Sequence, residues 1–519
     1  MKGSSLLSAV FYGFSYFAWF HKTDRQNCYD YYLALSPIES TGSLGYSLVW
    51  EKCMQRMIWK LMRFLYALGT PHLEQPANRH DGTNNALYRL MVWTANQLKV
   101  LIPLHIRTEI FNRILAITSK TTGKTENGIP SHVDNFKQSW GVNIIGCFKG
   151  ELGIGESARS SLRAFSTIPV AVNAVDYRLG FKSRMNEEVF HELKNSIKPY
   201  DINLFHVNGD LTLAAYNEMG SDLCNGAYNI GYWVWETTEM PSQWLYATQV
   251  LDEIWTASNF CREVIGKKVA LPVVRIPHNV SPVAAAQVGR EEFGIPKDGF
   301  VFLNMADFFS TPERKNPIGC VSAFFKAFGK RPKDIYLVLK ISNSKNRPEI
   351  LETIKKLAKD NESLILLDDY LDRGRVNALI SCCDCYVSLH RAEGFGLPLA
   401  EAMYFGKPVI ATAWSGNMDF MNEDNSFPVR YSLVPIEHDV DHYTRGASWA
   451  EPDLDHAAEL MKKVVSCPEM VRQISENARE TIHGHYSPES VGTMILHRLN
   501  AIRDERECRN GSKKQPHQV

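Results

Sequence analysis

The chain has 519 residues, which is too long for one ordinary hydrophobic core and predicts two or three domains. Apolar residues make up 45% and charged residues 22%, an average globular composition that argues against extended disorder, collagen-like repeats and a polytopic membrane protein. Lys+Arg and Asp+Glu both number 57, so the formal net charge is zero. Because proteins that bind DNA or RNA usually carry a basic excess, nucleic acid is not an expected partner.

Residues 1–135 are expected to form a helical N-terminal extension. Residues 5–20 are apolar, but a helix of that length spans roughly 24 Å, short of the roughly 30 Å hydrocarbon layer of a membrane. Residues 54–68 mix bulky apolar side chains with cations, a pattern that suits either a peripheral membrane contact or an ordinary packed helix. A third helical stretch covers residues 85–117, and the polar run after it predicts a boundary near residue 135.

Beyond that boundary, short apolar runs alternate with helical stretches, which predicts parallel sheets covered by helices. We expect two doubly wound domains, 136–285 and 286–486, followed by a helix over 487–503 and a polar tail over 504–519. The predicted strands are 142–145, 202–205, 230–234, 254–257 and 273–276 in the first domain, and 301–305, 335–341, 364–367, 385–389 and 408–412 in the second. Since ligands bind at the carboxyl ends of such strands, functional residues should directly follow these runs.

The stretch 390–403 passes from a buried strand directly into a helix. Gly394 and Gly396 allow the backbone to approach a ligand closely, and Pro398 suits the first helical turn. Free backbone N–H groups at this helix N-terminus would form an anion site. The N–H groups concerned belong to Phe395, Gly396 and Leu397.

Two carboxylates flank this turn. Glu401 lies about one turn into the helix, where its carboxylate could accept two hydroxyl hydrogen bonds from a ribose. Glu393 precedes the glycines and could contact another part of the same ligand. Two glutamates separated by seven residues around a glycine turn are much more specific than a bare Gly-x-Gly.

The stretch 388–403 resembles the donor-binding signature of the retaining family-4 glycosyltransferases, which have the GT-B fold. The resemblance covers roughly residues 140 to 500 and does not extend to 1–135. It implies two Rossmann-like domains facing a cleft, with a nucleotide-diphosphate sugar bound against the second domain and the 487–503 helix packed back on the first. The other similar stretches, in the expected order, are 231–241, 252–260, 313–317, 406–421 and 449–453.

In the second domain, the resemblance implies that Arg314 and Lys315 neutralise the donor diphosphate and stabilise charge on the departing nucleotide. The family's more typical arginine would lie at about Phe309, so Arg314 either replaces it or is a surface cation. Lys340 either joins this pair or is a solvated lysine at a strand end.

In the first domain, the turn 146–156 resembles the family's glycine turn, in which Gly153 and Gly155 would reach over the donor phosphates. The alternative is a tight strand-to-helix connection without a ligand. The turn lacks the G-x-G-x-x-G fingerprint, so no dinucleotide site is expected.

Two residues are the candidate catalytic groups by this resemblance. His206 ends a predicted strand and would contact the transferred sugar near its reacting carbon, orienting it or sharing developing charge; the alternative is a structural histidine. Glu393 would act from the second domain. Glu236 either meets the acceptor or merely follows an aromatic core segment.

No metal and no cofactor beyond the sugar nucleotide are expected. Asp-x-Asp occurs at 439–441 and 453–455, but neither match closes a buried strand. The nearest approach to a cysteine cluster, 382–385, has no second pair or spaced histidines nearby, so we expect packing residues and a reducing compartment.

The resemblance therefore implies a retaining hexosyltransferase, expected to be metal-independent, that moves a sugar to a hydroxyl of a glycan or lipid-linked acceptor in cell-surface polysaccharide biosynthesis. The expected location is the cytoplasm, or the inner face of the membrane if residues 1–135 provide a peripheral contact. The alternatives are a sugar-nucleotide epimerase or phosphorylase, a non-catalytic protein that binds nucleotide sugars on the same scaffold, and a membrane scaffold with a vestigial second half.

Overall fold

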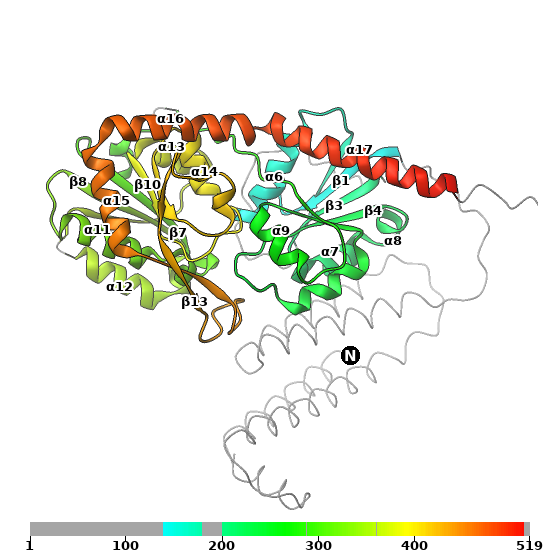
Figure 1. The fold of residues 1–519 in the computed structure, drawn as a ribbon, viewed down its shortest axis with the longest axis horizontal. Coiled ribbons are helices and arrows are strands. Elements are labelled where there is room, and N and C mark those ends of the chain that lie inside the picture. Colours follow the sequence, from blue (N-terminus) through cyan, green and yellow to red (C-terminus); the bar gives the residue numbers. More distant parts are fainter. Residues whose placement is uncertain (1–138, 179–199, 287, 360, 513–519) are drawn as a thin grey trace, which may run out of the picture. The chain divides into compact units, whose positions relative to one another are not determined.

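The structure, a computed structural model, describes residues 139–178, 200–286, 288–359 and 361–512, which all belong to one compact unit, 94–519. The predictions for residues 1–135 and the end of the tail lie outside the described residues. The described chain contains two parallel sheets of six strands and one short antiparallel sheet (Figure 1).

The first sheet has the strand order β2-β1-β3-β4-β5-β6, and all of its pairings are parallel. Its central strands are buried on both faces because helices cover them, which accounts for the continuous apolar runs in the sequence. Its strands are β1 (Ser139–Gly146), β2 (Val172–Asp176), β3 (Tyr200–His206), β4 (Tyr228–Tyr232), β5 (Glu253–Thr256) and β6 (Val273–Arg275). Its helices are α6 (Gly153–Phe165), α7 (Gly209–Met219), α8 (Ser221–Cys224), the 3-10 helix η3 (Ser242–Val250) and α9 (Asn259–Gly266).

The second sheet has the order β12-β11-β10-β7-β8-β9, again entirely parallel. If β7 to β12 are renumbered 1 to 6 and the sheet is read from its β9 edge, the strand order is 3-2-1-4-5-6. This is the order of a doubly wound nucleotide-binding fold. Its strands are β7 (Phe300–Asp307), β8 (Ile335–Ser342), β9 (Leu364–Asp368), β10 (Cys385–Ser388), β11 (Val409–Thr412) and β12 (Phe427–Val429). Its α-helices are α10 (Pro312–Lys315), α11 (Pro317–Phe328), α12 (Pro348–Ala358), α13 (Arg373–Cys382), α14 (Leu397–Tyr404), α15 (Leu454–Ser466) and α16 (Pro468–His485). Its 3-10 helices are η4 (Arg290–Phe293), η5 (Phe308–Ser310), η6 (Ser344–Asn346) and η7 (Gly416–Asp419).

The two sheets confirm the predicted fold class, and each of the ten predicted strands is present. The sequence analysis missed β2, β12 and an antiparallel hairpin of β13 (Tyr431–Pro435) and β14 (Ser448–Pro452). This hairpin contacts the first domain, since Ser448 N donates to Thr238 Oγ1 at 2.8 Å and Tyr443 OH donates to Glu236 Oε2 at 3.2 Å. Glu236 therefore follows an aromatic core segment and is also tied to the hairpin.

The last helix, α17 (Pro488–Ser512), packs back on the first domain against α6 (Figure 1). Arg498 Nε donates to the buried Glu253 carboxylate at 2.9 Å, and Arg506 donates to the Asp201 carbonyl at 2.9 Å. The helix is longer than predicted: residues 504–512, expected in the polar tail, continue it. Its fully buried residues are Val491, Ile495, Leu499 and Ile502.

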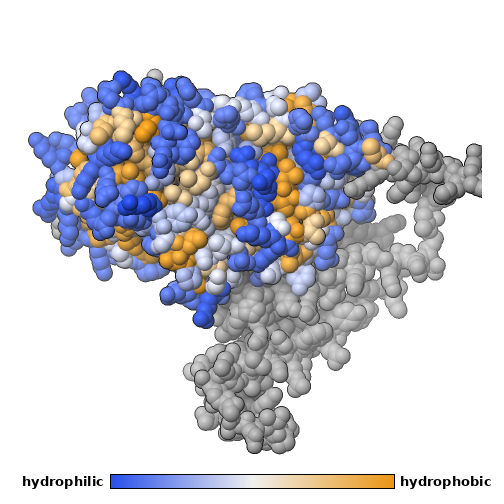
Figure 2. All heavy atoms as spheres, in the orientation of Figure 1, coloured by the Kyte–Doolittle hydropathy of each residue, from blue (hydrophilic) through white to orange (hydrophobic). Residues whose placement is uncertain are grey.

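Hydrophilic residues predominate on the face drawn in Figure 2, with apolar residues grouped between them. Within the described ranges, we find no helix that is both long and apolar enough to cross a bilayer.

Candidate active site

The predicted site residues follow strands that flank the point where the strand order of each sheet reverses. In the first sheet this point lies between β1 and β3, whose last residues, Gly146 and His206, are register partners. In the second sheet it lies between β7, which leads to Arg314 and Lys315, and β10, which leads to Glu393. Ligands of doubly wound folds bind beside such points, so the topology supports the predicted location of the site.

The turn after β10 is shaped by its glycines. A Cβ atom on Gly394 would overlap Val234 of the first domain, so only glycine permits this close packing. Gly396 has a φ of 92°, a left-handed conformation that favours glycine, and it immediately precedes α14 with Pro398 in the first turn. Among the described residues, the backbone N–H groups of Phe395 and Leu397 donate no hydrogen bond to another backbone group. The predicted anion site requires such N–H groups.

The turn that carries the two cations is strained and anchored. Thr311 and Asn316, which bracket α10, have φ values of 59° and 52°, and non-glycine residues in this region are concentrated at functional sites. The Asn316 side chain caps α11 by accepting from Gly319 N at 3.1 Å, and it also donates to the Leu389 carbonyl at 2.9 Å. The same side chain thus fixes the cationic turn to the turn after β10.

Arg314, Lys315 and Glu393 form one buried cluster. Lys315 is ion-paired with Glu393, and Arg314 Nη1 lies 3.4 Å from the same carboxylate and donates to the Ala392 carbonyl at 2.7 Å. Burial by itself would raise the pKa of Glu393, but the charges of Lys315 and Arg314 outweigh it and hold this pKa at about 2. Arg314 is only 4% exposed, so it is not a surface cation. Lys340 is buried as well and not solvated.

Glu401 lies in α14, where the sequence analysis placed it. Its side chain is 2% exposed and is ion-paired with Arg373, the first residue of α13. Its second oxygen, Oε2, has no hydrogen-bond partner among the described residues. An unpaired buried carboxylate oxygen costs free energy, which a hydroxyl donor from a ligand would recover.

His206 is fully buried at the end of β3. Its Nδ1 is 3.2 Å from Ser157 Oγ of α6, while its Nε2 finds no partner in the part of the chain that the structure describes. Burial, with a smaller contribution from the nearby His278, lowers the pKa of His206 to about 3. The ring is therefore neutral at pH 7 and can donate or accept a hydrogen bond, but it does not supply a positive charge.

The two glycines of the turn after β1 differ. A Cβ atom on Gly155 would overlap the Gly150 carbonyl, whereas the space around Gly153 is open. Gly153 begins α6, whose N-terminus has no side-chain cap. In its first turn, burial would raise the pKa of Glu156, but positive charges, with Arg373 first among them, hold it at about 2. Gly155 is thus required for packing, and Gly153 leaves the N-terminus of α6 uncovered.

Ring contacts connect the candidate residues of the two domains. His206 stacks on Tyr232 with centroids 4.5 Å apart, Tyr232 stacks on His278 at 5.6 Å, and His278 meets Phe395 edge-on at 5.0 Å. In addition, Ser258 Oγ donates to the carbonyl of the turn after β10 at 2.7 Å. The strand ends of the two sheets therefore meet around this turn. No hydrogen bond links His206 directly to Glu393 in the described chain.

Several members of the site are accessible at its edge: Lys315, Leu397 and Pro398 are partly exposed, and the side chain of Arg373 is 31% exposed. The sequence analysis missed Arg373 because an arginine at the start of a helix carries no signal of its contacts.

The Asp-x-Asp matches have structural roles. Asp441 accepts from Thr311 Oγ1 at 2.7 Å and pairs with Arg347 at 2.6 Å, and Asp453 caps α15. Cys383 and Cys385 are buried packing residues, as predicted. No cluster of three or more His, Cys, Asp or Glu side chains within the described ranges is arranged to hold a metal ion.

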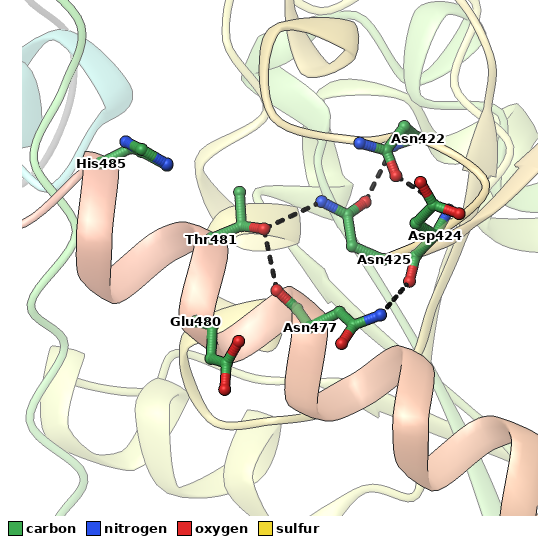
Figure 3. Close-up of a pocket in the computed structure, with 7 residues that line it drawn as sticks. All are labelled: Asn422, Asp424, Asn425, Asn477, Glu480, Thr481 and His485. Carbon is green, nitrogen blue, oxygen red and sulfur yellow. Dashed lines mark hydrogen bonds between the residues drawn. The ribbon is translucent and has the colours of Figure 1, made fainter.

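A separate polar pocket of about 300 Å³ lies between α16 and the segment before β12 (Figure 3). Asn425 donates to Thr481 Oγ1 across it at 3.2 Å. It contains none of the predicted site residues, so it is not part of the candidate active site. The residues that line it are Asn422, Asp424, Asn425, Asn477, Glu480, Thr481 and His485.

The structure defines a class of fold: two Rossmann-like domains with this arrangement are those of the GT-B fold. Residues 290–481 match the sequence model of the family Glycosyl transferases group 1. The match includes Arg314, Lys315, Glu393 and Glu401. The resemblance seen in the sequence is thereby confirmed at the level of this family and of the GT-B fold.

The similar proteins are distant. A trehalose synthase of Rubrobacter xylanophilus is 22% identical over 346 residues, which cover 61% of this chain and 74% of the relative. The crystal structure of a sucrose-phosphate synthase from Thermosynechococcus elongatus has a TM-score of 0.54 at 14% identity, covering 70% of this chain and 100% of its own. Alr3699/HepE of Anabaena, crystallised with UDP and glucose, has a TM-score of 0.50 at 14% identity and the same coverage. At these identities the structural likeness concerns the fold.

Proposed function

We propose that the protein transfers a sugar from a nucleotide-diphosphate sugar to a hydroxyl of a glycan or lipid-linked acceptor, with retention of anomeric configuration and without a metal ion. The observation that carries this proposal is the buried Glu401 carboxylate, whose Oε2 lacks a partner among the described residues, beside the open N-terminus of α14. The helix N-terminus suits the diphosphate, and the carboxylate suits the two hydroxyls of a ribose.

In this proposal each candidate residue has one role. Glu393, which stays ionised because of its two cationic neighbours, accepts hydrogen bonds from sugar hydroxyls. Lys315 faces the diphosphate and stabilises the charge that builds on it as the bond from the sugar carbon to the phosphate oxygen breaks. His206 uses its unpaired Nε2 to orient the sugar. The acceptor oxygen then bonds to the same face of the sugar carbon by front-face displacement, without a long-lived covalent intermediate.

The proposed setting is the biosynthesis of cell-surface polysaccharide in the cytoplasm, with residues 1–135 providing a peripheral membrane contact. That region lies outside the described residues. Deletion of residues 1–70 should release the protein from liposomes, and a protein that never binds liposomes would contradict the membrane contact.

The test of the main proposal is nucleotide binding. UDP-, GDP-, ADP- and dTDP-sugars are screened for thermal stabilisation, and the affinity of the best is measured by calorimetry for the wild type and Glu401→Gln. Loss of a charged hydrogen-bond pair to a ribose should weaken binding on the order of 10- to 100-fold. Glu480→Gln, in the separate polar pocket, is the matched control and should bind like the wild type. Equal affinities for Glu401→Gln and the wild type would refute the proposed site.

A sugar-nucleotide epimerase on the same scaffold would also bind the donor. Isomerised donor without transfer to any acceptor in a cell extract would favour that alternative, and binding without any turnover would favour a non-catalytic protein.

A further inference from the structure

Lys340 is a buried lysine to which the proposed function gives no role. It lies near the carboxyl end of β8 and is only 8% exposed. Among the described residues, its amine forms no hydrogen bond and no ion pair. Burying an amine without a hydrogen-bond partner costs free energy, which an acceptor atom of a ligand would recover.

The side chain of Lys340 points to the face of the second sheet that α13 and α14 cover. Val338, two residues earlier, belongs to the same core cluster as residues of α13 and α14, whereas Leu339 belongs to a different cluster. Since successive residues of a strand point to opposite faces, Lys340 shares the face of Val338. It therefore lies on the same side of the sheet as Glu401 of α14.

The position of Lys340 along the sheet corresponds to the base of a bound nucleotide. The ion pair of Glu401 with Arg373, the first residue of α13, puts a ribose held by Glu401 beside the segment 369–372, which joins β9 to α13. In β8, which pairs with β9, Lys340 is the register partner of Leu367. The diphosphate and the base are attached to opposite ends of the ribose. With the diphosphate at the N-terminus of α14, the base extends toward the carboxyl ends of β8 and β9, where Lys340 lies.

The charges near Lys340 suit a neutral acceptor better than a phosphate. Three carboxylates lie at the carboxyl ends of β7 and β9: Asp307, Asp368 and Asp369. Other donors hold two of them. The Asn343 side chain donates to Asp307 at 2.7 Å, and Ser344 Oγ donates to Asp368 at 2.9 Å. These negative charges would repel an anionic phosphate but not a carbonyl oxygen.

The protonation state of Lys340 does not decide whether it can donate. Burial lowers the pKa of this lysine, and the charges of the three carboxylates oppose that change. An amine has N–H donors with or without the additional proton.

We propose that Lys340 donates a hydrogen bond to a carbonyl oxygen of the nucleobase and thereby determines which base the donor carries. This inference rests on the proposed function. Uracil, thymine and guanine have a carbonyl oxygen at the position of the ring where adenine has an amino group. With adenine, the buried amine would stay without an acceptor, so the site discriminates against ADP-sugars.

The experiment is calorimetric titration of the full chain with UDP, GDP, ADP and dTDP. The wild type should bind one of the three carbonyl-containing nucleotides more tightly than ADP. Lys340→Met removes the amine and keeps an unbranched apolar side chain. It should lower the affinity for the best nucleotide about 10- to 100-fold and change the affinity for ADP less than about 3-fold. The ratio of the two affinities should therefore fall toward one, which a purely structural role of Lys340 would not cause.

Lys326→Met is the matched control. Lys326 lies on α11 and is ion-paired with Asp455 of α15. This variant should keep the affinities and the ratio of the wild type.

Three outcomes would overturn the inference and leave the proposed function intact. The first is a wild type that binds ADP most tightly, and the second is Lys340→Met with unchanged affinities. The third is an equal loss for ADP and the best nucleotide, which would indicate a phosphate contact or a structural role. A wild type that binds none of the four nucleotides would overturn both the inference and the proposed function.

Discussion

Replacing His206 by glutamine should remove a large part of the acid sensitivity of the first domain. Burial lowers the pKa of His206 to about 3 in the folded protein, whereas an unfolded chain has a histidine pKa of about 6.5. Between these values the unfolded state binds a proton that the folded state does not. The free energy of unfolding therefore decreases as the pH falls below about 6.5, and this loss continues down to about pH 3.

The magnitude follows from the two pKa values. From pH 7 to pH 4.5 the unfolded state gains its proton over roughly two pH units, each worth about 1.4 kcal/mol, so His206 contributes a loss of roughly 2.7 kcal/mol. Burial also lowers the pKa of His278, to about 4, which adds a loss of similar size. His206→Gln should therefore abolish about half of the decrease in unfolding free energy that these two histidines together cause between pH 7 and pH 4.5.

The assay is urea unfolding at pH 7 and pH 4.5, followed by tryptophan fluorescence. Trp233 and Trp255 are buried in the first domain and report on its unfolding. The relevant quantity is the difference between the two pH values, since the substitution also changes stability at either pH. His497→Gln, on the exposed side of α17, should behave like the wild type. If His206→Gln shows the same pH difference as the wild type, His206 is not held neutral in the folded state and the argument fails.

Three further substitutions test the site. Gly394→Ala should destabilise the protein by about 1–3 kcal/mol because the new methyl group overlaps Val234, and adding Val234→Ala should restore part of the loss in urea unfolding. Asn316→Ala removes both the cap of α11 and the hydrogen bond to the Leu389 carbonyl, and it should cost about 2 kcal/mol of unfolding free energy; Asn316→Asp keeps a capping oxygen but loses the donor to Leu389, so it should also destabilise the protein. Lys315→Gln leaves the buried Glu393 carboxylate with only the longer contact to Arg314 and should lower stability at pH 7 by about 1–3 kcal/mol; an unchanged urea midpoint would show that the pair is not formed.

The fold could be predicted because the central strands are buried on both faces and therefore appear as continuous apolar runs. The elements that were missed lack this signal. Only one residue of β2 is buried, β12 has three residues including Pro428, and the β13 residues are mostly exposed. Both β2 and β12 are edge strands, and strands at the edge of a sheet carry fewer buried apolar residues than central strands.

The site could be predicted in part. Glu393, Glu401 and Lys315 follow strands and belong to a recognisable motif, so position along the chain was sufficient to find them. The position of Arg373 depends on how α13 packs beside α14, and that contact joins residues 28 positions apart. The sequence alone did not show whether Arg314 is a surface cation. Its burial in the structure excludes that alternative. The hydrogen bond of Tyr443 to the first domain required the missed hairpin.

The position of α17 has a consequence for synthesis. Its residues Ile495, Leu499 and Ile502 complete the hydrophobic interior of a domain whose first strand begins some 350 residues earlier, at Ser139. During translation, part of the apolar surface of the first domain therefore stays exposed until the ribosome has synthesised α17, near the end of the chain. A stop codon placed just after α16 would leave the second domain whole and would remove the helix that covers part of the hydrophobic core of the first domain.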